Sequence, residues 1–283
     1  MKDIDFSRIY SFSKLELFDK CKKQYHFNYL DPEIAPIKKQ FLKPRDYNIK
    51  GSAVHGAITL FYYLPEKKRT LPNLKKCLEK SWFSEKDVYK KPPLGETGGF
   101  KDIHHERDTY KEALGLLRNF FNLEKQINPT LFYVPVETIK DSFKDYEKMI
   151  KPLDGGMSIS GKFDRIDKLE NGSLRVVDFK TGKNGDNFFQ LEFYKLLAEA
   201  NFGTKVDQVS FYCLAKGKVK NFNVCDVDSK DIRDKIIDKI KEIQETKDFP
   251  PQKSYLCNHC DFKEICPAFV KAPPGNYVLN INR

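Results

Sequence analysis

The sequence predicts an α/β fold in which helices come first and a sheet follows. Apolar residues recur at helical spacing through residues 104–125, and isoleucines stripe one face of a later helix over residues 232–243. From Leu131 onward the pattern changes to that of short strands. A further helix is expected at 187–201, after a strand pair, so helices and strands mix in the second half of the chain.

The individual elements follow in order. A capping box, Ser13-x-x-Glu16, starts the first helix, which ends before Asp31-Pro32. Residues 92–99 are interpreted as a flexible linker and a candidate lid. The other expected elements are a helix around His55, helices at 73–89 and 104–125, strands at 131–137 and 140–145, the strand pair at 161–183, a helix at 187–201, strands at 206–214 and 218–224, and a final helix that leads to the last cysteines.

Length and composition describe a basic globular protein. The chain has 283 residues, enough for a full core, with 50 basic and 40 acidic residues and a net charge of +10. This charge suits a polyanionic partner, and basic runs such as residues 216–218 are candidate phosphate contacts or solvated loops. No apolar stretch approaches the length of a membrane helix. Seven cysteines, an odd number, and the lack of a leader sequence favour a reducing, cytoplasmic setting.

We expect one composite domain in three parts. Residues 1–130 form a helical amino-terminal part, residues 131–226 form the core that contains the sheet, and residues 227–283 form a carboxyl-terminal helix and a cysteine-rich segment.

The strand pair is predicted to be a β-hairpin whose turn contains the Asn-Gly pair at 171–172. A two-residue loop would place Lys168 opposite Arg175, and like charges directly opposite each other are destabilising. A three-residue loop, residues 170–172 with the glycine in the left-handed conformation, instead pairs Asp167 with Arg175. We therefore expect the three-residue loop.

The same register pairs Asp164 with Asp178 and Lys162 with Lys180, so one face carries Asp164, Asp178 and Lys180 together. Two carboxylates can hold a hard divalent cation. A lysine beside them can orient or activate an attacking water and offset charge on a phosphate. The alternative is a solvent-facing hairpin with ordinary salt bridges. Apolar residues on both strands place the charged groups beside a core and favour the metal site.

Cysteines near the carboxyl end have the spacing of metal ligands. Cys257-x-x-Cys260 followed by Cys266 supplies three thiolates, and a fourth ligand must come from elsewhere, with Cys21 as the candidate. The alternatives are a zinc site, with the same four thiolates or with His259, and cysteines that pack as small hydrophobic residues. The asymmetric spacing fits zinc poorly, and polar neighbours argue against simple packing.

Five blocks in order resemble the PD-(D/E)xK nuclease superfamily in its RecB-like branch. The blocks are Ser11-Phe12-Ser13-Lys14-Leu15 with Phe18 and Cys21, Gly51-x-x-x-His55, Gly161-x-x-Asp164-Arg165-x-Asp167, Asp178-Phe179-Lys180-Thr181-Gly182, and Gln190-x-x-x-Tyr194. This branch includes the AddB and RecB nuclease domains and the CRISPR-associated and replication-associated iron–sulfur nucleases. No block is specific alone, but five in order with the cysteine set make chance an unsatisfactory explanation.

The resemblance implies a restriction-endonuclease-like core, a mixed central sheet flanked by helices, with a helical amino-terminal cap and a carboxyl-terminal cysteine cluster. It also implies two sets of site residues. Magnesium or manganese would be held by His55, Asp164, Asp178 and the carbonyl of Phe179, with Lys180 as the catalytic lysine and with Gln190 and Tyr194 steadying the site or the DNA backbone. A structural [4Fe–4S] cluster would be held by Cys21, Cys257, Cys260 and Cys266.

Two of these residues keep alternatives. A histidine on an otherwise apolar helix, as His55 is, is more often a core residue than a ligand. Glu137, at the end of an apolar run, is either a supporting carboxylate or a strand-end residue in solvent.

The sequence thus predicts a magnesium- or manganese-dependent DNA exonuclease acting on single-stranded or end-frayed DNA. The alternative from another class is a non-catalytic DNA-binding scaffold that works beside a helicase. The pathway is recombination and repair, with a helicase as partner, or CRISPR spacer acquisition, with integration proteins as partners.

Overall fold

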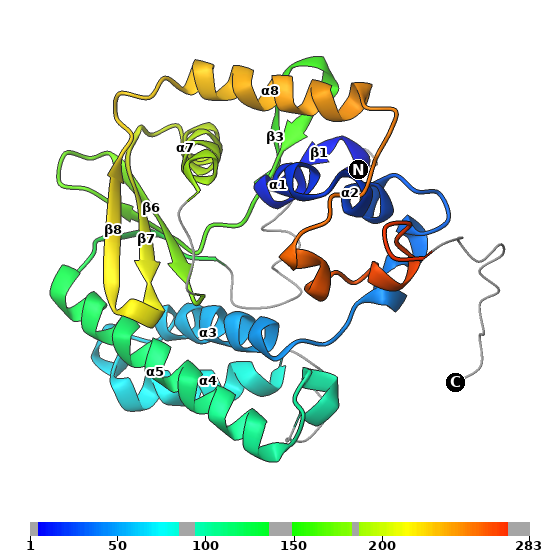
Figure 1. Cartoon of the computed structure of the whole chain (residues 1–283). Coiled ribbons are helices and arrows are strands. Elements are labelled where there is room, and N and C mark those ends of the chain that lie inside the picture. Colours follow the sequence, from blue (N-terminus) through cyan, green and yellow to red (C-terminus); the bar gives the residue numbers. More distant parts are fainter. Residues whose placement is uncertain (1–4, 85–93, 136–148, 183–186, 271–283) are drawn as a thin grey trace. The chain divides into compact units, whose positions relative to one another are not determined.

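The computed structural model describes residues 5–84, 94–135, 149–182 and 187–270 (Figure 1). The chain forms two compact units. The first comprises Met1–Ile9 and Pro44–Ile237, and the second comprises Tyr10–Lys43 and Asp238–Arg283.

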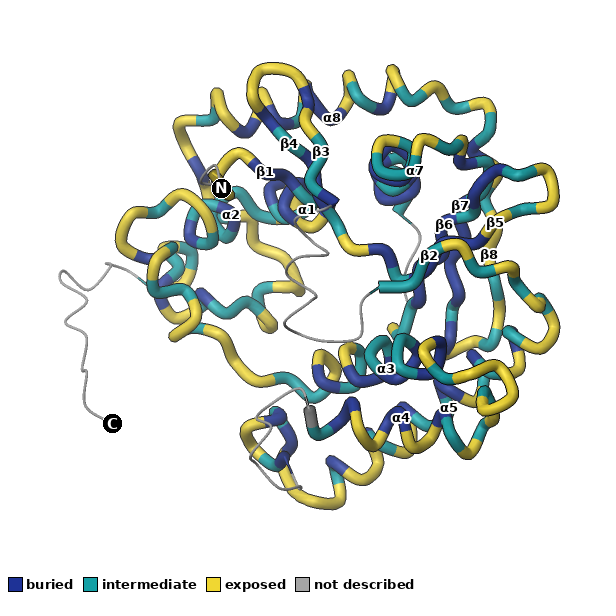
Figure 2. The backbone as a smooth tube through the Cα atoms, turned by 180° about the vertical axis from the view of Figure 1, so that it is seen from behind, coloured by how far each residue is buried: buried dark blue, intermediate teal, exposed yellow. Residues whose placement is uncertain are grey.

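A five-stranded mixed sheet forms the centre of the first unit. Its strands, in spatial order, are β2 (Leu131–Tyr133), β5 (Arg165–Lys168), β6 (Leu174–Lys180), β7 (Val206–Cys213) and β8 (Lys218–Asn223). Strands β6 and β7 are parallel, and the other neighbours are antiparallel. Figure 2 shows β6 and β7 buried along most of their length, as expected for central strands covered on both faces. The predicted α/β class, with a mixed sheet flanked by helices, is confirmed.

Helices cover both faces of this sheet (Figure 1). They are α3 (Asp46–Tyr62), α4 (Leu71–Ser84), α5 (Ile103–Ile127) and α7 (Phe188–Phe202). The first three share one apolar core with Val177, Phe179 and Tyr212 of the sheet. Helix α7 packs on the opposite face. Helices α3 and α4 approach closely at Gly56, where a Cβ would lie 2.2 Å from the Ser81 Oγ, so any larger residue would force the Ser81 side chain to move.

Short elements complete the first unit. They are the 3₁₀ helices η1 (Phe6–Arg8), η3 (Glu66–Lys68), η4 (Gly95–Gly98), η5 (Asp154–Gly156) and η6 (Leu214–Lys216), and the antiparallel strands β3 (Lys151–Pro152) and β4 (Ser158–Ile159). The boundary between the units falls within β1 (Ile9–Tyr10) and within α8 (Ser229–Glu245).

The second unit joins an early and a late segment of the chain. Its elements are α1 (Phe12–Lys20), α2 (Lys22–Tyr29), η2 (Ala35–Phe41), η7 (Tyr255–His259) and η8 (Lys263–Ile265), together with the end of α8. The ring of Phe27 packs on that of Phe262 with centroids 5.4 Å apart, and Phe18 packs on Phe249 at 6.4 Å. Apolar contacts therefore connect the two segments.

The hairpin of β5 and β6 adopts the predicted register. Asp167 pairs with Arg175. Gly172 has φ 84°, the left-handed conformation expected for the last residue of a three-residue loop. The N–H of Leu169 donates to the Ser173 carbonyl at 2.8 Å and closes the loop.

The strand before this turn is shorter than predicted. Strand β5 begins at Arg165, so Asp164 lies just before the ladder and Lys162 does not pair with Lys180 in it. The pairing predicted between Asp164 and Asp178 is therefore not a strand pair, although the two carboxylates remain close enough to interact electrostatically.

The first helix also differs from the prediction. It begins at Phe12, and its N-cap is Ser11, not Ser13, because the Ser11 side chain accepts the N–H of Lys14 at 3.2 Å. The helix is interrupted at Cys21, whose extended conformation (φ −165°, ψ 106°) separates α1 from α2. The cysteine thereby lies at a helix junction.

The linker before α5 is anchored in the part that the structure describes. Leu94 is buried, and its N–H donates to the buried carboxylate of Glu106 at 2.9 Å. The described portion of the candidate lid is thus fastened to α5, which contradicts a freely moving segment there. The rest of that linker, the strand expected at 140–145 and Glu137 lie outside the described residues.

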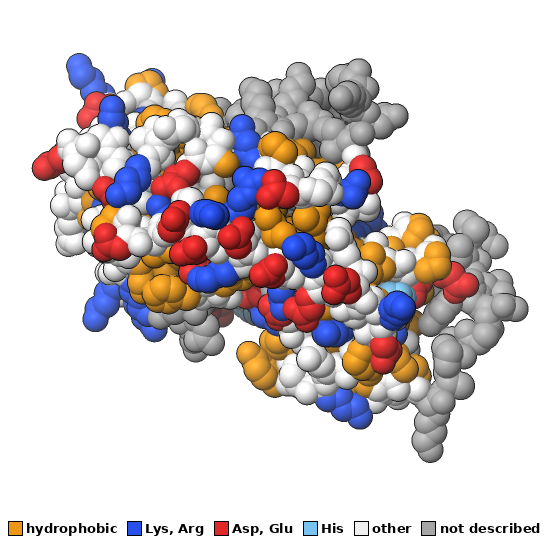
Figure 3. All heavy atoms as spheres, turned by 90° about the horizontal axis from the view of Figure 1, so that it is seen from above, with side chains coloured by type: hydrophobic (Ala, Val, Ile, Leu, Met, Phe, Trp, Pro, Cys, Tyr) orange, Lys and Arg blue, Asp and Glu red, His pale blue; other side chains and the backbone are white. Residues whose placement is uncertain are grey.

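Charged side chains of both signs intermingle on the face seen in Figure 3, so the excess positive charge is not concentrated there.

Among the helices of the described ranges, none combines the length and apolarity that crossing a membrane requires.

The buried side chain of Arg165 connects the sheet to helices of one face. Its guanidinium donates to Glu124 Oε1 on α5 at 2.5 Å and to the Tyr62 hydroxyl on α3. Within the sheet it donates to Asp167 Oδ2 at 3.0 Å and to the Tyr212 hydroxyl at 2.9 Å. Arg165 is 0% and Asp167 is 1% exposed. Charges so deeply buried are tolerated because each has an opposite charge and hydrogen-bond partners.

Replacing Arg165 with Met should lower the free energy of unfolding by about 3–5 kcal/mol, because Glu124 and Asp167 lose a buried counter-charge. Urea denaturation followed by circular dichroism measures this loss. Arg118→Met, on the exposed surface of α5, is the matched control and should cost less than about 0.5 kcal/mol. An equal effect of the two substitutions would show that the buried cluster contributes nothing specific.

Candidate functional site

Three of the predicted site residues meet just before β5. Asp164 Oδ1 lies 2.8 Å from His55 Nδ1, and Asp164 Oδ2 accepts the N–H of Phe179 at 2.8 Å. Asp164 therefore joins helix α3 to strand β6. Gly51 lies one turn before His55 on α3. It faces Thr181, the residue after β6, since a Cβ at Gly51 would lie 3.4 Å from Thr181 Oγ1. His55 is thus a hydrogen-bonding partner of a carboxylate and not simply a core residue of α3.

The remaining predicted residues form a connected network beside this group. Lys180 Nζ lies 2.9 Å from Asp178 Oδ2 and donates to Gln190 Oε1 at 2.9 Å. The amide nitrogen of Gln190 donates to Asp178 Oδ1 at 3.3 Å and to the Tyr194 hydroxyl at 3.4 Å. Gln190 therefore holds the lysine and the carboxylate at once, with opposite ends of its amide group.

Local structure explains why these side chains converge. Alternation along β6 places Asp178 and Lys180 on the face covered by α7, and Phe179 on the opposite face. Asn187 caps α7 by accepting the N–H of Gln190 at 3.3 Å. The cap starts the helix where Gln190 falls in its first turn, over β6.

Burial and like charge dominate the electrostatics. Burial is the largest influence on Asp178 and raises its pKa, and the charge of Asp164 raises it further against the opposing effects of Lys180 and His55. Burial lowers the pKa of His55, but the charge and hydrogen bond of Asp164 outweigh burial, so this pKa is raised overall. The negative charge of Asp164 contributes to both shifts, although burial is the larger cause for Asp178, and negative charge of this kind is expected where a cation belongs.

The donor set fits a hard divalent cation. The two carboxylates and the Phe179 carbonyl supply the oxygen ligands that magnesium and manganese prefer, and the imidazole of His55 adds a nitrogen donor beside them. Asp178 Oδ2 is buried without a hydrogen bond, and its contact is the ammonium group of Lys180. Over the ranges that the structure describes, no three His, Cys, Asp or Glu side chains are already arranged as a metal site. A cation would thus replace contacts within the group, such as that between His55 and Asp164.

The four cysteines predicted to act together line one cavity in the second unit. Cys21 lies between α1 and α2, and Cys257, Cys260 and Cys266 lie in or beside η7 and η8. Burial raises the pKa of the Cys260 thiol, and the charges of the other three cysteines raise it further. The four sulfur atoms are therefore near enough to interact. His259 is not among the residues that line this cavity.

Backbone groups also point at these sulfur atoms. The N–H of Ser254 donates to Cys257 Sγ at 3.4 Å, and the backbone of Phe262 hydrogen-bonds to the Cys260 thiol. Hydrogen bonds to sulfur are a feature of thiolate ligands in clusters. All seven cysteines are free thiols, and Cys77, Cys213 and Cys225 lie away from this cavity lining.

Sequence reasoning missed two residues near the site. Arg165 stands between two aspartates of a recognised block but received no role, and its partner Glu124 carries no local signal on α5. Phe188 immediately follows the cap of α7 and is 68% exposed, a large value for an aromatic residue two positions before Gln190. Its exposure is a property of the folded chain.

Comparisons with known proteins show what the chain is similar to. A sequence model of the PD-(D/E)XK nuclease superfamily matches residues 9–267. The CRISPR system Cms protein Csm5 of Methanocaldococcus jannaschii is 28% identical over 190 residues, which cover 58% of this chain and 44% of that protein. Gene 69 protein of Mycobacterium phage L5 is 25% identical over 293 aligned positions, covering 92% of this chain and 96% of that protein.

A third relative is a subunit of the ATP-dependent helicase/deoxyribonuclease of Streptococcus mutans. It is 33% identical over 131 residues, which cover 45% of this chain and 10% of that protein. The chain therefore spans less than half the length of two of these three curated relatives and nearly all of the phage protein.

Because burial and Asp164 disfavour the ionised form of Asp178, Asp178→Asn should raise the melting temperature of the metal-free protein at pH 8. A raised folded-state pKa means that protonation stabilises the wild type as the pH falls, so the advantage of the variant should shrink towards pH 5. Thermal unfolding in EDTA at both pH values measures the effect. Asp167→Asn, which removes a buried carboxylate paired with two arginines, is the control and should lower the melting temperature. Destabilisation by both substitutions would contradict this account of Asp178.

Proposed function

The chain belongs to the PD-(D/E)XK nuclease superfamily, and from this premise we propose that it is a magnesium- or manganese-dependent DNA nuclease. The observation that carries the proposal is the network in which Gln190 holds Lys180 and Asp178 together, next to the pair formed by Asp164 and His55. A salt bridge of purely structural value would not require two adjacent carboxylates whose charges oppose each other.

His55, Asp164, Asp178 and the Phe179 carbonyl would hold the cation. When bound, it would supply Lewis-acid polarisation of the phosphate and lower the pKa of the attacking water. The lysine beside the cation ligands supplies hydrogen-bond donors of its own. Lys180 has three N–H donors. Gln190 accepts one, and the ammonium group also forms an ion pair with Asp178, so a donor remains for a water or a phosphate oxygen.

The proposed reaction is the phosphodiester hydrolysis that membership of this superfamily implies. Water attacks phosphorus, the bond to the 3′ oxygen breaks, and that oxygen takes a proton, which leaves a 5′-phosphate and a 3′-hydroxyl. The ammonium group of Lys180 offsets the negative charge that builds on the phosphate oxygens. Gln190 acts as a positioning residue, because its hydrogen bonds fix the lysine and the carboxylate before substrate arrives, and Tyr194 supports it by accepting a hydrogen bond from the Gln190 amide.

We assign the enzyme to exonucleolytic cleavage of single-stranded or end-frayed DNA. One relative is named as a subunit of a helicase/deoxyribonuclease, which supports DNA as the substrate and a helicase as the partner in recombination and repair. The name of another, a CRISPR system protein, supports the alternative partners, CRISPR integration proteins. The free thiols suit a reducing cytoplasm. A non-catalytic scaffold is the second candidate, and the intact set of Asp164, Asp178 and Lys180 weighs against it.

We further assign a structural [4Fe–4S] cluster to Cys21, Cys257, Cys260 and Cys266. Their common cavity and the N–H groups directed at their sulfur atoms support this assignment. The cluster would connect residues separated by more than two hundred positions and so reduce the conformational entropy of the unfolded chain. Zinc bound to the same four thiolates is the alternative.

Lys180→Ala should lower the rate of DNA cleavage by at least about 100-fold, because its charge is placed at the phosphate. End-labelled single- and double-stranded DNA, incubated with magnesium, manganese or chelator, gives the rates and the direction of digestion. Lys195→Ala, a buried lysine of α7 that bonds to Glu199 away from the site, is the control for a general loss of stability. Full cleavage by the Lys180 variant would remove this lysine from the mechanism.

Cys260→Ser should abolish the cluster and lower the melting temperature of anaerobically purified protein. Iron and sulfide content, visible absorbance and thermal unfolding measure the outcome. Cys225→Ser, a half-buried cysteine of the first unit, is the matched control and should leave the iron content unchanged. A Cys260 variant with full iron content would contradict the ligand set, and stoichiometric zinc in place of iron would favour the zinc alternative.

A further inference from the structure

Strand β8 extends the catalytic face of the sheet to its edge. Lys220 pairs with Phe211 of β7, which pairs with Asp178 of β6. Two residues earlier on β8, Lys218 pairs with Cys213 of β7, which pairs with Lys180 of β6. Directly paired residues point to the same face. The face that carries the site therefore continues, two strand spacings or about 10 Å away, into two exposed lysines of the edge strand.

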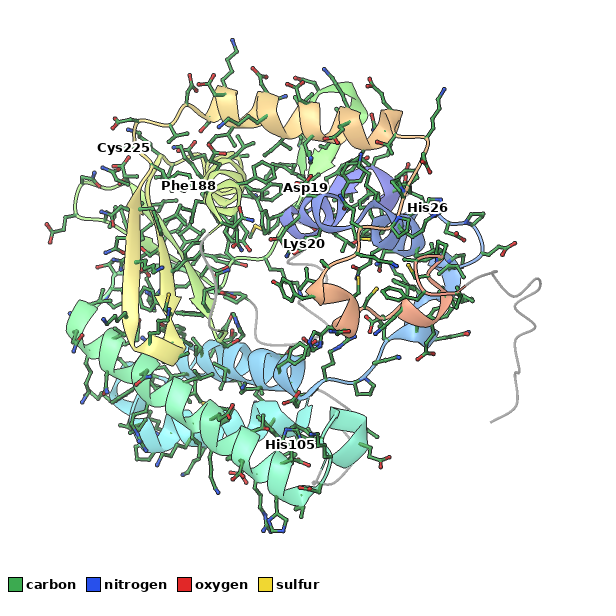
Figure 4. All side chains as sticks on the ribbon, in the orientation of Figure 1. Asp19, Lys20, His26, His105, Phe188 and Cys225 are labelled. Carbon is green, nitrogen blue, oxygen red and sulfur yellow. The ribbon has the colours of Figure 1, made fainter. Side chains whose placement is uncertain are left out.

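Aromatic rings form a continuous path along the same face. Lys180 Nζ lies 4.8 Å from the ring centroid of Phe211. Phe211 packs on Phe222 of β8 at 5.8 Å, and Phe222 packs on Phe188 of α7 at 6.0 Å with the rings at 79°. The path ends in solvent, because Phe211 is 0% exposed and Phe188 is 68% exposed. Figure 4 shows Phe188 at α7, beside the sheet.

We propose that Phe188, supported by Phe222, stacks on unpaired bases next to the scissile phosphate, while Lys218 and Lys220 contact the adjoining phosphates. This inference rests on the proposed nuclease function and specifies its substrate as a single strand. We call these four residues the β8 strip.

The chemistry of the β8 strip favours this occupant. An exposed phenyl ring gains from covering its face, and base–aromatic stacking tolerates any base because every base has a π face. Lysines beside the ring match the negative charge of the backbone. In a duplex the bases are already stacked on each other and their faces are closed to Phe188. The strip therefore selects strands whose bases are free, as at frayed ends.

The position of Phe188 links recognition to cleavage. It is the first residue of α7, and Gln190, two residues on, contacts both Lys180 and Asp178. A base stacked on Phe188 would thus place its own backbone near the turn of helix that orients the catalytic groups. Binding at the ring and the hydrogen bond that orients Lys180 therefore both depend on the first turn of α7.

The test measures binding of fluorescent oligothymidylate, and of an abasic strand of equal length, by anisotropy in EDTA so that no cleavage occurs. Phe188→Ala should weaken oligothymidylate binding by about 5- to 100-fold and leave abasic binding nearly unchanged. Phe188→Trp should restore binding. The control is Phe132→Ala, at the opposite edge of the same sheet, because Phe132 is 43% exposed and also packs edge-on against one phenylalanine, Phe202, at 5.3 Å.

The lysines are tested through salt dependence. Replacing Lys218 and Lys220 together with Ala should weaken the binding of both oligonucleotides and reduce the slope of log affinity against log salt by about 1.4 units. Lys168→Ala, an exposed lysine at the end of β5, should not change the slope.

Equal oligothymidylate binding by the Phe188 and Phe132 variants would overturn the stacking role, as would an equal loss on the abasic strand. If wild-type protein cleaves DNA while these binding results fail, the β8 strip is wrong and the nuclease function stands. If wild-type protein binds the strand as expected but never cleaves it, the β8 strip stands and the proposed catalysis fails.

Discussion

Arg165 carries its positive charge in the interior of the first unit, and the arrangement around the site depends on how that charge is neutralised. Its partners come from two helices on one face, through Glu124 of α5 and Tyr62 of α3, and from the sheet, through Asp167 and Tyr212. Because an unpaired buried charge is so costly, these elements can adopt few other relative positions. Asp164, a carboxylate of the candidate metal site, immediately precedes Arg165 in the chain. The position of the buried Arg165 cluster therefore also fixes the position of Asp164 next to β5.

In the candidate site, by contrast, the buried charge is not fully neutralised. Asp178 is buried next to Asp164, and both burial and this like charge oppose its ionisation. Gln190 and Lys180 offset part of that cost through their contacts with Asp178. The ion pairs of Arg165 do not involve Asp164 or Asp178. A cation bound by these two carboxylates would therefore leave the buried ion pairs intact. Asp167 thus belongs to the ion pairs that stabilise the fold, whereas Asp178 is one of the residues to which we assign the proposed chemistry.

The second unit brings together an early and a late segment of the chain. Aromatic contacts such as that of Phe27 with Phe262 hold the early and late segments together, and the four cysteines line a cavity in the same unit. The break at Cys21 matters here, because an uninterrupted helix would leave this side chain among ordinary helical neighbours. The extended residue between α1 and α2 instead presents its sulfur to the late cysteines.

Local patterns were enough to predict the mixed α/β class, the three-residue turn ending at Gly172 and the register of Asp167 with Arg175, because periodicity, turn chemistry and like-charge repulsion act between near neighbours. They misplaced the first helix cap and the start of β5, where competing serines or a motif glycine give similar local signals. The network of Arg165 escaped prediction because Tyr62 lies 103 residues away in the chain. The exposure of Phe188 escaped it as well, since a solvent-facing ring over an edge strand exists only after α7 has packed on the sheet.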